Sequence, residues 1–153
     1  MPPPTVPPAT APPATVPVAT VPPATVPPAT VPVGLGIDLV DVARFASVLL
    51  RRPSIAERLF THGERSYAAT LANPAPSLAV RFAAKEAVMK ALGVGLGAFA
   101  FADLEVQREP SGEPRLVLSG RAADLASQRS VRTWLVSLTH TSTTAAAVVV
   151  ALA

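Results

Sequence analysis

Apolar positions in the middle of the chain predict a long helix that is mostly buried. Between Ser77 and Gly93 the sequence is rich in alanine, with a serine suited to the N-cap at one end and a glycine just past the other. At 100° per residue its apolar side chains fall on two nearly opposite faces, Leu78, Phe82, Met89 and Leu92 on one and Val80, Ala84, Ala87 and Ala91 on the other. Such a helix belongs inside a domain, and the prolines of residues 73–76 are interpreted as a break before it.

A strand is predicted over residues 33–40, ahead of that helix. Apolar residues at 35, 37 and 39 alternate there with Gly36, Asp38 and Val40, so Asp38 lies on the face opposite the three large apolar side chains. The two glycines at 34 and 36 do not indicate a dinucleotide-binding loop. The third glycine of that fingerprint is absent, and Asp38 lies within the strand pattern.

The remaining patterns predict short helices and antiparallel strands. A helix from Asp41 to about Leu50 stops before Pro53, and capping-box patterns at 54–57 and 61–64 begin two more short helices. The later elements are a strand at 103–107, a turn at 110–112, a strand at 114–118, a helix at 121–129, and strands at 131–139 and 144–152 around a turn at 140–143. The predicted fold class is α+β, an antiparallel sheet packed on the long central helix.

The N-terminal segment has a different composition from the rest. Residues 6–30 form five pentads of the type Val-Pro-Pro-Ala-Thr, and the first 33 residues hold no charge and 13 of the 18 prolines. We therefore predict a disordered or extended tail over 1–32 and a single domain over 33–153. The chain shows neither a secretory signal pattern nor an apolar run of the roughly 20 residues that span a bilayer, so a cytoplasmic location without membrane contact is expected.

Composition narrows the possible chemistry. There is no cysteine, which excludes a disulfide framework, a thiol nucleophile and a Cys-ligated zinc site, and two histidines are too few for a histidine-rich metal site. The net charge of +3 suits an acidic partner or a polyphosphate substrate. Basic patches interleaved with aromatic residues are missing from the sequence, so nucleic-acid binding is not expected.

Three charged residues on apolar elements are the candidates for chemistry. Glu86 and Lys90 are spaced i,i+4 and project together from the central helix, which by itself fits an ordinary surface ion pair. Asp38 adds a second carboxylate from a separate apolar strand, where an unpaired charge would be costly. Two carboxylates from different elements with a lysine beside them suit Mg²⁺ and a phosphate substrate. The glycine-spaced loop 93–97 fits either close approach to a ligand or a simple change of chain direction.

Three segments resemble a known family. Residues 36–44 (Gly-Ile-Asp-Leu-Val-Asp-Val-Ala-Arg) and 81–93 (Arg-Phe-Ala-Ala-Lys-Glu-Ala-Val-Met-Lys-Ala-Leu-Gly) closely resemble the two signature motifs of the holo-(acyl-carrier-protein) synthases, which are small phosphopantetheinyl transferases. Residues 136–141 and 145–150 resemble the C-terminal strands of the same family. The resemblance covers the chain from about Val33 to its end.

The resemblance implies a reaction and a set of site residues. The 4′-phosphopantetheine arm of coenzyme A would move to a serine of an acyl carrier protein, in fatty acid and lipid biosynthesis, releasing adenosine 3′,5′-bisphosphate. Asp38 and Glu86 would hold Mg²⁺, with Lys90 as the positive group beside them. The expected coenzyme-binding residues are Lys85, Lys90, His140 and Thr141. Lys85 either reaches the coenzyme phosphates or neutralises the neighbouring carboxylate, and the serine proton passes either to a metal-bound water or to a carboxylate.

The resemblance also implies partners. A homotrimer with sites between subunits is expected, and an acidic carrier protein would dock on the helix after Asp38. The residues expected at that surface are Arg44, Arg51 and Arg52 around an exposed Val48. The alternative is a non-catalytic binding or structural domain on a proline-rich stalk, but such a domain has no need for Asp38, Glu86 and Lys90 on apolar elements. A hydrolase triad of Ser137, His140 and Asp38 is rejected, because no nucleophile-elbow glycines surround Ser137. The sequence leaves open which carrier is served and whether the tail is translated in the cell.

Overall fold

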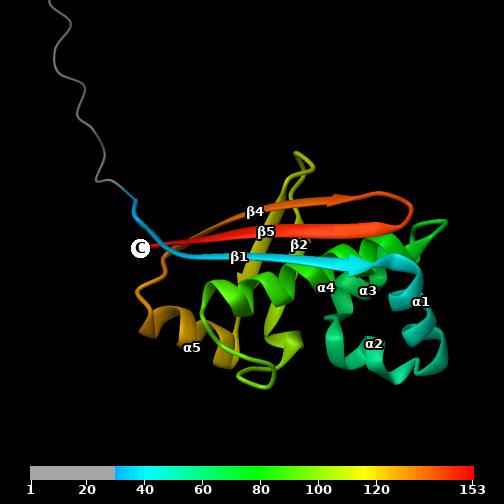
Figure 1. Cartoon of the computed structure of the whole chain (residues 1–153), viewed down its shortest axis with the longest axis horizontal. Helices are drawn as coiled ribbons and strands as arrows, with labels where there is room; N and C mark the ends of the chain where they lie inside the picture. Colours follow the sequence, from blue (N-terminus) through cyan, green and yellow to red (C-terminus); the bar gives the residue numbers. More distant parts are fainter. Residues whose placement is uncertain (1–29) are drawn as a thin grey trace, which may run out of the picture.

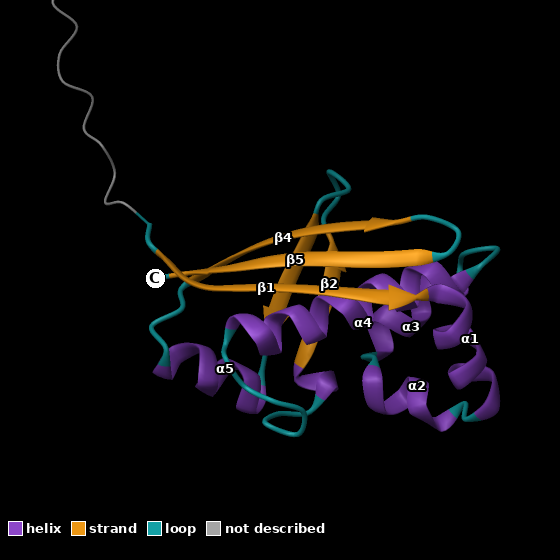
Figure 2. Cartoon of the chain, in the orientation of Figure 1, coloured by secondary structure: helices purple, strands orange, loops and turns teal. Residues whose placement is uncertain are grey.

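The computed structural model describes residues 30–153, so the tail predicted over 1–32 lies almost wholly outside the described residues. The chain is α+β, as predicted, with helices gathered on one side of an antiparallel sheet (Figures 1 and 2). The helices are α1 (Val42–Arg51), α2 (Ser54–Leu59), α3 (His62–Ala69), α4 (Pro74–Ala91) and α5 (Gly120–Gln128), with a short 3₁₀ helix η1 (Phe101–Asp103). The strands are β1 (Pro32–Asp41), β2 (Leu104–Arg108), β3 (Pro114–Leu118), β4 (Thr133–His140) and β5 (Thr144–Leu152).

The strands form two antiparallel groups. β5 lies between β1 and β4 in a three-stranded sheet, in which Asp38 pairs with Ala147 and His140 pairs with Ala145. β2 and β3 form the predicted hairpin. Strands β1 and β4 are therefore the two edges of the main sheet, and residues from these opposite edges were both expected at the active site.

Small residues let α4 lie directly against the sheet. The residues of β5 that face the helix are Ala145, Ala147, Val149 and Ala151, all of them buried. On β1 the helix-facing positions include Gly34 and Gly36, where a Cβ atom would collide with the backbone of Ala91 and Ala87 respectively. Close packing between backbone and backbone thus fixes β1 against α4.

The predicted buried helix is confirmed, but its first turn was misread. Asn73 is the N-cap, its side-chain oxygen accepts from the backbone N–H of Ala75 at 3.2 Å, and Pro74 and Pro76 lie in the first turn. Prolines are tolerated there because the first-turn N–H groups have no partner within the helix. Ser77 is consequently not the cap but a buried helical residue whose hydroxyl accepts from Arg81. Gly93, with φ of +61°, ends the helix as predicted.

The other elements agree with the prediction to within a few residues, with one difference in capping. Thr61 and Glu64 form the predicted capping box at the start of α3. The box expected at Ser54 is absent, because Ser54 is already helical and Pro53 occupies the cap position without a side-chain bond. Among residues 30–153, no helix is both long enough and apolar enough to cross a bilayer.

Candidate active site

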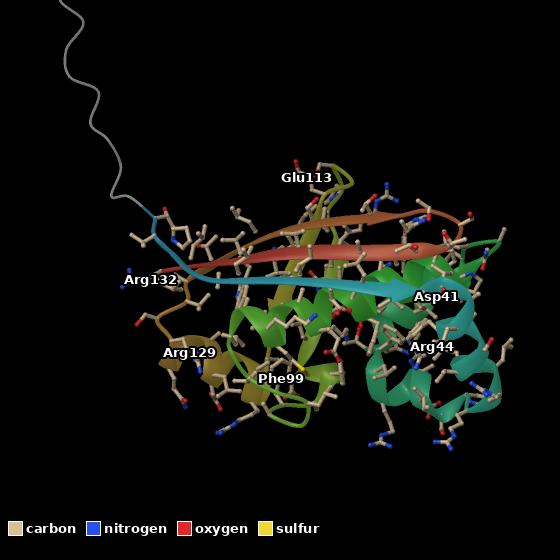
Figure 3. The ribbon with its side chains drawn as sticks, viewed as in Figure 1. Asp41, Arg44, Phe99, Glu113, Arg129 and Arg132 are labelled. Atoms are coloured by element: carbon tan, nitrogen blue, oxygen red, sulfur yellow. The ribbon has the colours of Figure 1, made fainter. Side chains whose placement is uncertain are left out.

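One cavity brings together the two carboxylates predicted as metal ligands. Asp38, near the end of β1, and Glu86, in the middle of α4, both line a cavity of about 580 Å³. Its other lining residues are Leu39, Val40, Asp41, Arg44, Phe45, Val48, Leu59, Phe82, Leu96 and Phe101. The cavity lies where β1 runs into α1, the end of the molecule marked by Asp41 and Arg44 in Figure 3.

Lys90 joins the strand to the helix at this site. Its Nζ donates to Asp38 Oδ1 and to the carbonyl oxygen of Ile37, each at 2.8 Å. Asp38 is the more enclosed partner, with 16% of its side chain exposed against 50% for Lys90. The ordinary ion pair that spacing alone allows between Lys90 and Glu86 is not among those of the described residues; Lys90 instead binds one oxygen of Asp38 and holds it beside α4.

Glu86 remains as a carboxylate in an unfavourable environment. Partial burial raises the pKa of Glu86, the nearby Asp38 carboxylate raises it further, and Lys90 acts in the opposite sense. Two carboxylates that repel each other in one cavity form a site that a bound cation would stabilise. Within residues 30–153 there is no group of three or more His, Cys, Asp or Glu side chains that could hold a metal. The two carboxylates at this cavity are of the type that could hold Mg²⁺, which is typically bound by one or two carboxylates with water and substrate oxygens completing its shell.

Aromatic rings form one wall of the cavity. Phe82 of α4 stacks between Phe45 of α1, at 5.3 Å between ring centroids, and Phe101 of η1, at 5.5 Å. Phe45 also meets Phe60 edge-on at 6.2 Å. Sequence analysis placed Phe82 on an apolar helix face but gave no indication of this stack, because η1 was not predicted.

Lys85 does not line the cavity and does not have the environment expected of a coenzyme ligand. Its side chain is fully buried, and Nζ forms an ion pair of 2.7 Å with Glu64. It also donates to three backbone carbonyl oxygens, those of Leu59, Phe101 and Leu104. Desolvation lowers the pKa of Lys85 despite the attraction of Glu64. With its donors used inside the protein, Lys85 has none left for a coenzyme phosphate or for Glu86.

His140 and Thr141 lie at the opposite edge of the sheet. His140 ends β4 and lines a separate cavity of about 480 Å³ together with Tyr67, Arg81, Arg108 and Ser137. Thr141 is in the following turn, where its hydroxyl oxygen accepts from the backbone N–H groups of Thr143 and Thr144. The structure does not bring these two residues into the cavity of Asp38 and Glu86 within one chain.

Arg81 is a candidate site residue that sequence reasoning missed. It is buried on α4, donates to both oxygens of Ser77, and lies over the ring of Tyr67 at 4.5 Å. Its Nε has no hydrogen-bond partner among the described residues. Burial lowers the pKa of Arg81 by removing water from the guanidinium. The signal in the sequence was an arginine on an otherwise apolar helix face.

The basic surface expected to dock the carrier adjoins the carboxylate cavity. Arg44, Arg51 and Arg52 are exposed on or just after α1. Arg44 and Val48 line the carboxylate cavity, and Val48, Arg51 and Arg52 line an adjoining cavity of about 290 Å³ with Ile55. Val48, expected to be exposed, is half-buried and lines both cavities.

Comparisons with known proteins show the family of this chain. The model of the family described as the 4′-phosphopantetheinyl transferase superfamily matches residues 34–150. The holo-[acyl-carrier-protein] synthase of Moorella thermoacetica is 46% identical over 113 residues, which cover 74% of this chain and 88% of that protein. The crystal structure of a holo-(acyl-carrier-protein) synthase from Bacillus anthracis in complex with CoA (3′,5′-ADP) is 33% identical, with a TM-score of 0.68, over 82% of this chain and 99% of that one. The Helicobacter pylori holo-[acyl-carrier-protein] synthase in complex with coenzyme A is 31% identical, with a TM-score of 0.67, over 76% of this chain and 98% of that one.

Proposed function

Because the chain belongs to the 4′-phosphopantetheinyl transferase superfamily, as an enzyme of the holo-(acyl-carrier-protein) synthase type, we propose the following reaction for it. The serine hydroxyl of an apo acyl carrier protein attacks the coenzyme A phosphorus that bears the pantetheine arm. The bond from that phosphorus to the bridging oxygen breaks, and adenosine 3′,5′-bisphosphate leaves. The cytoplasm is the proposed place of this reaction. The observation that carries the proposal is that Asp38 and Glu86 line one cavity and that Lys90 forms an ion pair with Asp38.

Asp38 and Glu86 are the proposed ligands of Mg²⁺. The ion, when bound, would neutralise negative charge on the pyrophosphate, which is what phosphoryl transfer chiefly requires. Lys90 holds Asp38 in place through one oxygen and adds a positive charge at the rim of the site. Glu86 has to lose its proton before it can bind a cation, so its raised pKa couples metal binding to pH. The serine proton passes to a carboxylate or to water.

The coenzyme is proposed to bind between two subunits. The carboxylate cavity lies at the β1 edge of the sheet and the cavity of His140 lies at the β4 edge, so one chain cannot join them. A ring in which the sheets of neighbouring subunits pack so that the β1 side of one adjoins the β4 side of the next would bring them together, and a homotrimer can form such a ring. His140, Thr141 and the positive charges of Arg81 and Arg108 would then face the phosphates of a coenzyme bound to the neighbouring subunit.

An apolar sheet face supports this assembly. Leu35, Ile37 and Leu39 of β1 are 68%, 54% and 65% exposed, and Leu135 of β4 is 56% exposed. Leu35 and Leu135 are both paired with Val150 of β5, so they lie in one row across the sheet. A contiguous apolar patch of this kind is typical of a protein interface.

The experiment is direct. The protein is incubated with coenzyme A, Mg²⁺ and an apo carrier protein, and the carrier is weighed by mass spectrometry. We expect the carrier to gain the mass of one phosphopantetheine, and we expect chelation of the metal or substitution of Asp38→Ala to abolish the gain while the protein stays folded. A carrier of unchanged mass with the unaltered protein would favour the non-catalytic binding domain instead.

A further inference from the structure

The buried ammonium group of Lys85 connects the main helix to four other elements. Its Nζ lies 2.8 Å from the carbonyl oxygen of Leu59 at the end of α2, 2.9 Å from that of Phe101 in η1, and 2.6 Å from that of Leu104 in β2. Glu64 of α3 is the fourth acceptor, at 2.7 Å. Four acceptors face the three donors of one ammonium group, so every donor is used.

Glu64 completes the network without leaving an oxygen free. Its Oε2 accepts from the backbone N–H of Thr61 at 2.9 Å, and its Oε1 accepts from that of Val106 at 3.0 Å. The side chains of Lys85 and Glu64 are both fully buried. A buried ion pair of this kind gives little net stability compared with apolar residues of the same size, because both charges lose their water. This points to a role for the pair in fixing the positions of the elements that it joins.

Two of the residues held by Lys85 are walls of the carboxylate cavity. Leu59 and Phe101 both line it, and Lys85 immediately precedes Glu86 on α4. We propose that Lys85 is a positioning residue, whose bonds to the carbonyls of Leu59 and Phe101 fix those two walls relative to the helix that presents Glu86. Without these bonds, α2 and η1 are held to α4 mainly by side-chain packing, and the distance between these walls and Glu86 is no longer fixed.

The kinetic test of this inference rests on the proposed function. Amide hydrogen exchange is therefore measured as well, because it does not depend on activity. Lys85→Met keeps most of the side-chain volume but removes every donor. We expect faster amide hydrogen exchange in residues 56–64 and 99–105, and a fall in kcat of about 10²-fold that persists at saturating coenzyme A and carrier. The matched control is Val149→Ala, a fully buried change on β5 away from the cavity. It should lower the unfolding temperature while leaving kcat within about twofold and exchange in the two wall segments unchanged.

The outcomes distinguish a failure of the proposed transferase function from a failure of the positioning role of Lys85. An unaltered protein without transferase activity would overturn the proposed function, and the exchange comparison alone would then decide the role of Lys85. If Lys85→Met does not fold, Lys85→Gln replaces it, because its shorter, uncharged side chain cannot make all the bonds of the ammonium group; the same direction is expected in exchange and kcat. A folded Lys85→Met or Lys85→Gln protein with unaltered exchange in both wall segments would overturn the proposal. So would kinetics that match those of Val149→Ala.

Discussion

Replacing Gly36 by alanine should push strand β1 away from helix α4. A Cβ atom at this position would lie 1.8 Å from the carbonyl oxygen of Ala87 and 2.7 Å from its carbonyl carbon. Since Cβ atoms essentially never approach another heavy atom closer than 3.0 Å, the gap must widen by at least 1.2 Å, which is 3.0 minus 1.8. The obstructing atoms belong to helix backbone, so no side chain can rotate out of the way.

Two consequences follow for Gly36→Ala, one in stability and one in rate. Overpacking of a core costs about 1–3 kcal/mol, which corresponds to a fall of about 4–12 °C in unfolding temperature for a domain of this size. Asp38 lies two residues further along the same strand, so the shift also moves it away from Glu86 and Lys90. Misplacement by about 1 Å costs about 10²-fold in rate. Thermal unfolding and the rate of holo-carrier formation measure the two effects.

Gly95→Ala is the matched control for the unfolding temperature. A Cβ atom there would meet nothing within 4 Å, and the backbone of Gly95 is not among those with positive φ. Its unfolding temperature should equal that of the unaltered protein. If Gly36→Ala unfolds at the same temperature as Gly95→Ala and transfers phosphopantetheine at the original rate, then β1 does not depend on backbone contact with α4 and the reasoning is wrong.

Four further predictions address the carboxylate pair, the assembly, the docking surface and the tail. Without metal, the free energy of unfolding should fall as pH rises from about 4.5 through the raised pKa of Glu86, because the native state keeps the Glu86 proton to a higher pH than the unfolded state does. Glu86→Gln should lack this pH dependence. Thermal unfolding curves recorded at a series of pH values measure it. Ile37→Glu should leave a folded monomer in light scattering with little activity, whereas a fully active monomer would contradict the proposed subunit-shared site. Arg44→Glu combined with Arg51→Glu should raise KM for the carrier at low salt and leave KM for coenzyme A unchanged; unaltered carrier kinetics would mean that these arginines only solvate α1. Deleting residues 1–30 should leave turnover nearly unchanged, since the deletion keeps the Val31 carbonyl oxygen, which accepts from the backbone N–H of Ala153; a large loss would show that the repeats contact the site or a partner.

The sequence was sufficient for elements whose signals are local. Thr61 and Glu64 meet the chemical requirements of a capping box at the correct spacing, and the box forms. Asn73-Pro74 is ambiguous, because the same dipeptide is typical of a turn and of a helix start with proline at its first position. The helix begins there, and Ala75 in its first turn packs against the core, a tertiary contact that a local pattern does not reveal.

The partners of the charged residues depended on tertiary structure instead. Spacing on α4 placed Lys90 beside Glu86, but the ammonium group of Lys90 binds Asp38, which is 52 residues earlier in the chain and lies on another element. Lys85 was expected near coenzyme phosphates or Glu86, and the residues that surround it come from α2, α3, η1 and β2. Helical spacing describes one element alone, so it cannot identify a partner contributed by another.

The strand β1 shows why an alternating pattern alone does not tell which face is covered. Its large apolar residues suggest an inward face, yet the side that faces α4 is the one with Gly34, Gly36 and Asp38. Glycine is needed there because the helix backbone itself occupies the space, and this close approach brings Asp38 to Lys90. The face with Ile37 is thereby left outward, and in the proposed trimer it meets another subunit. One strand would then determine both the position of a metal ligand and the formation of the coenzyme site, so a change on either face should reduce the same activity by a different route. Gly36→Ala should do so with a lowered unfolding temperature, and Ile37→Glu should do so by preventing assembly.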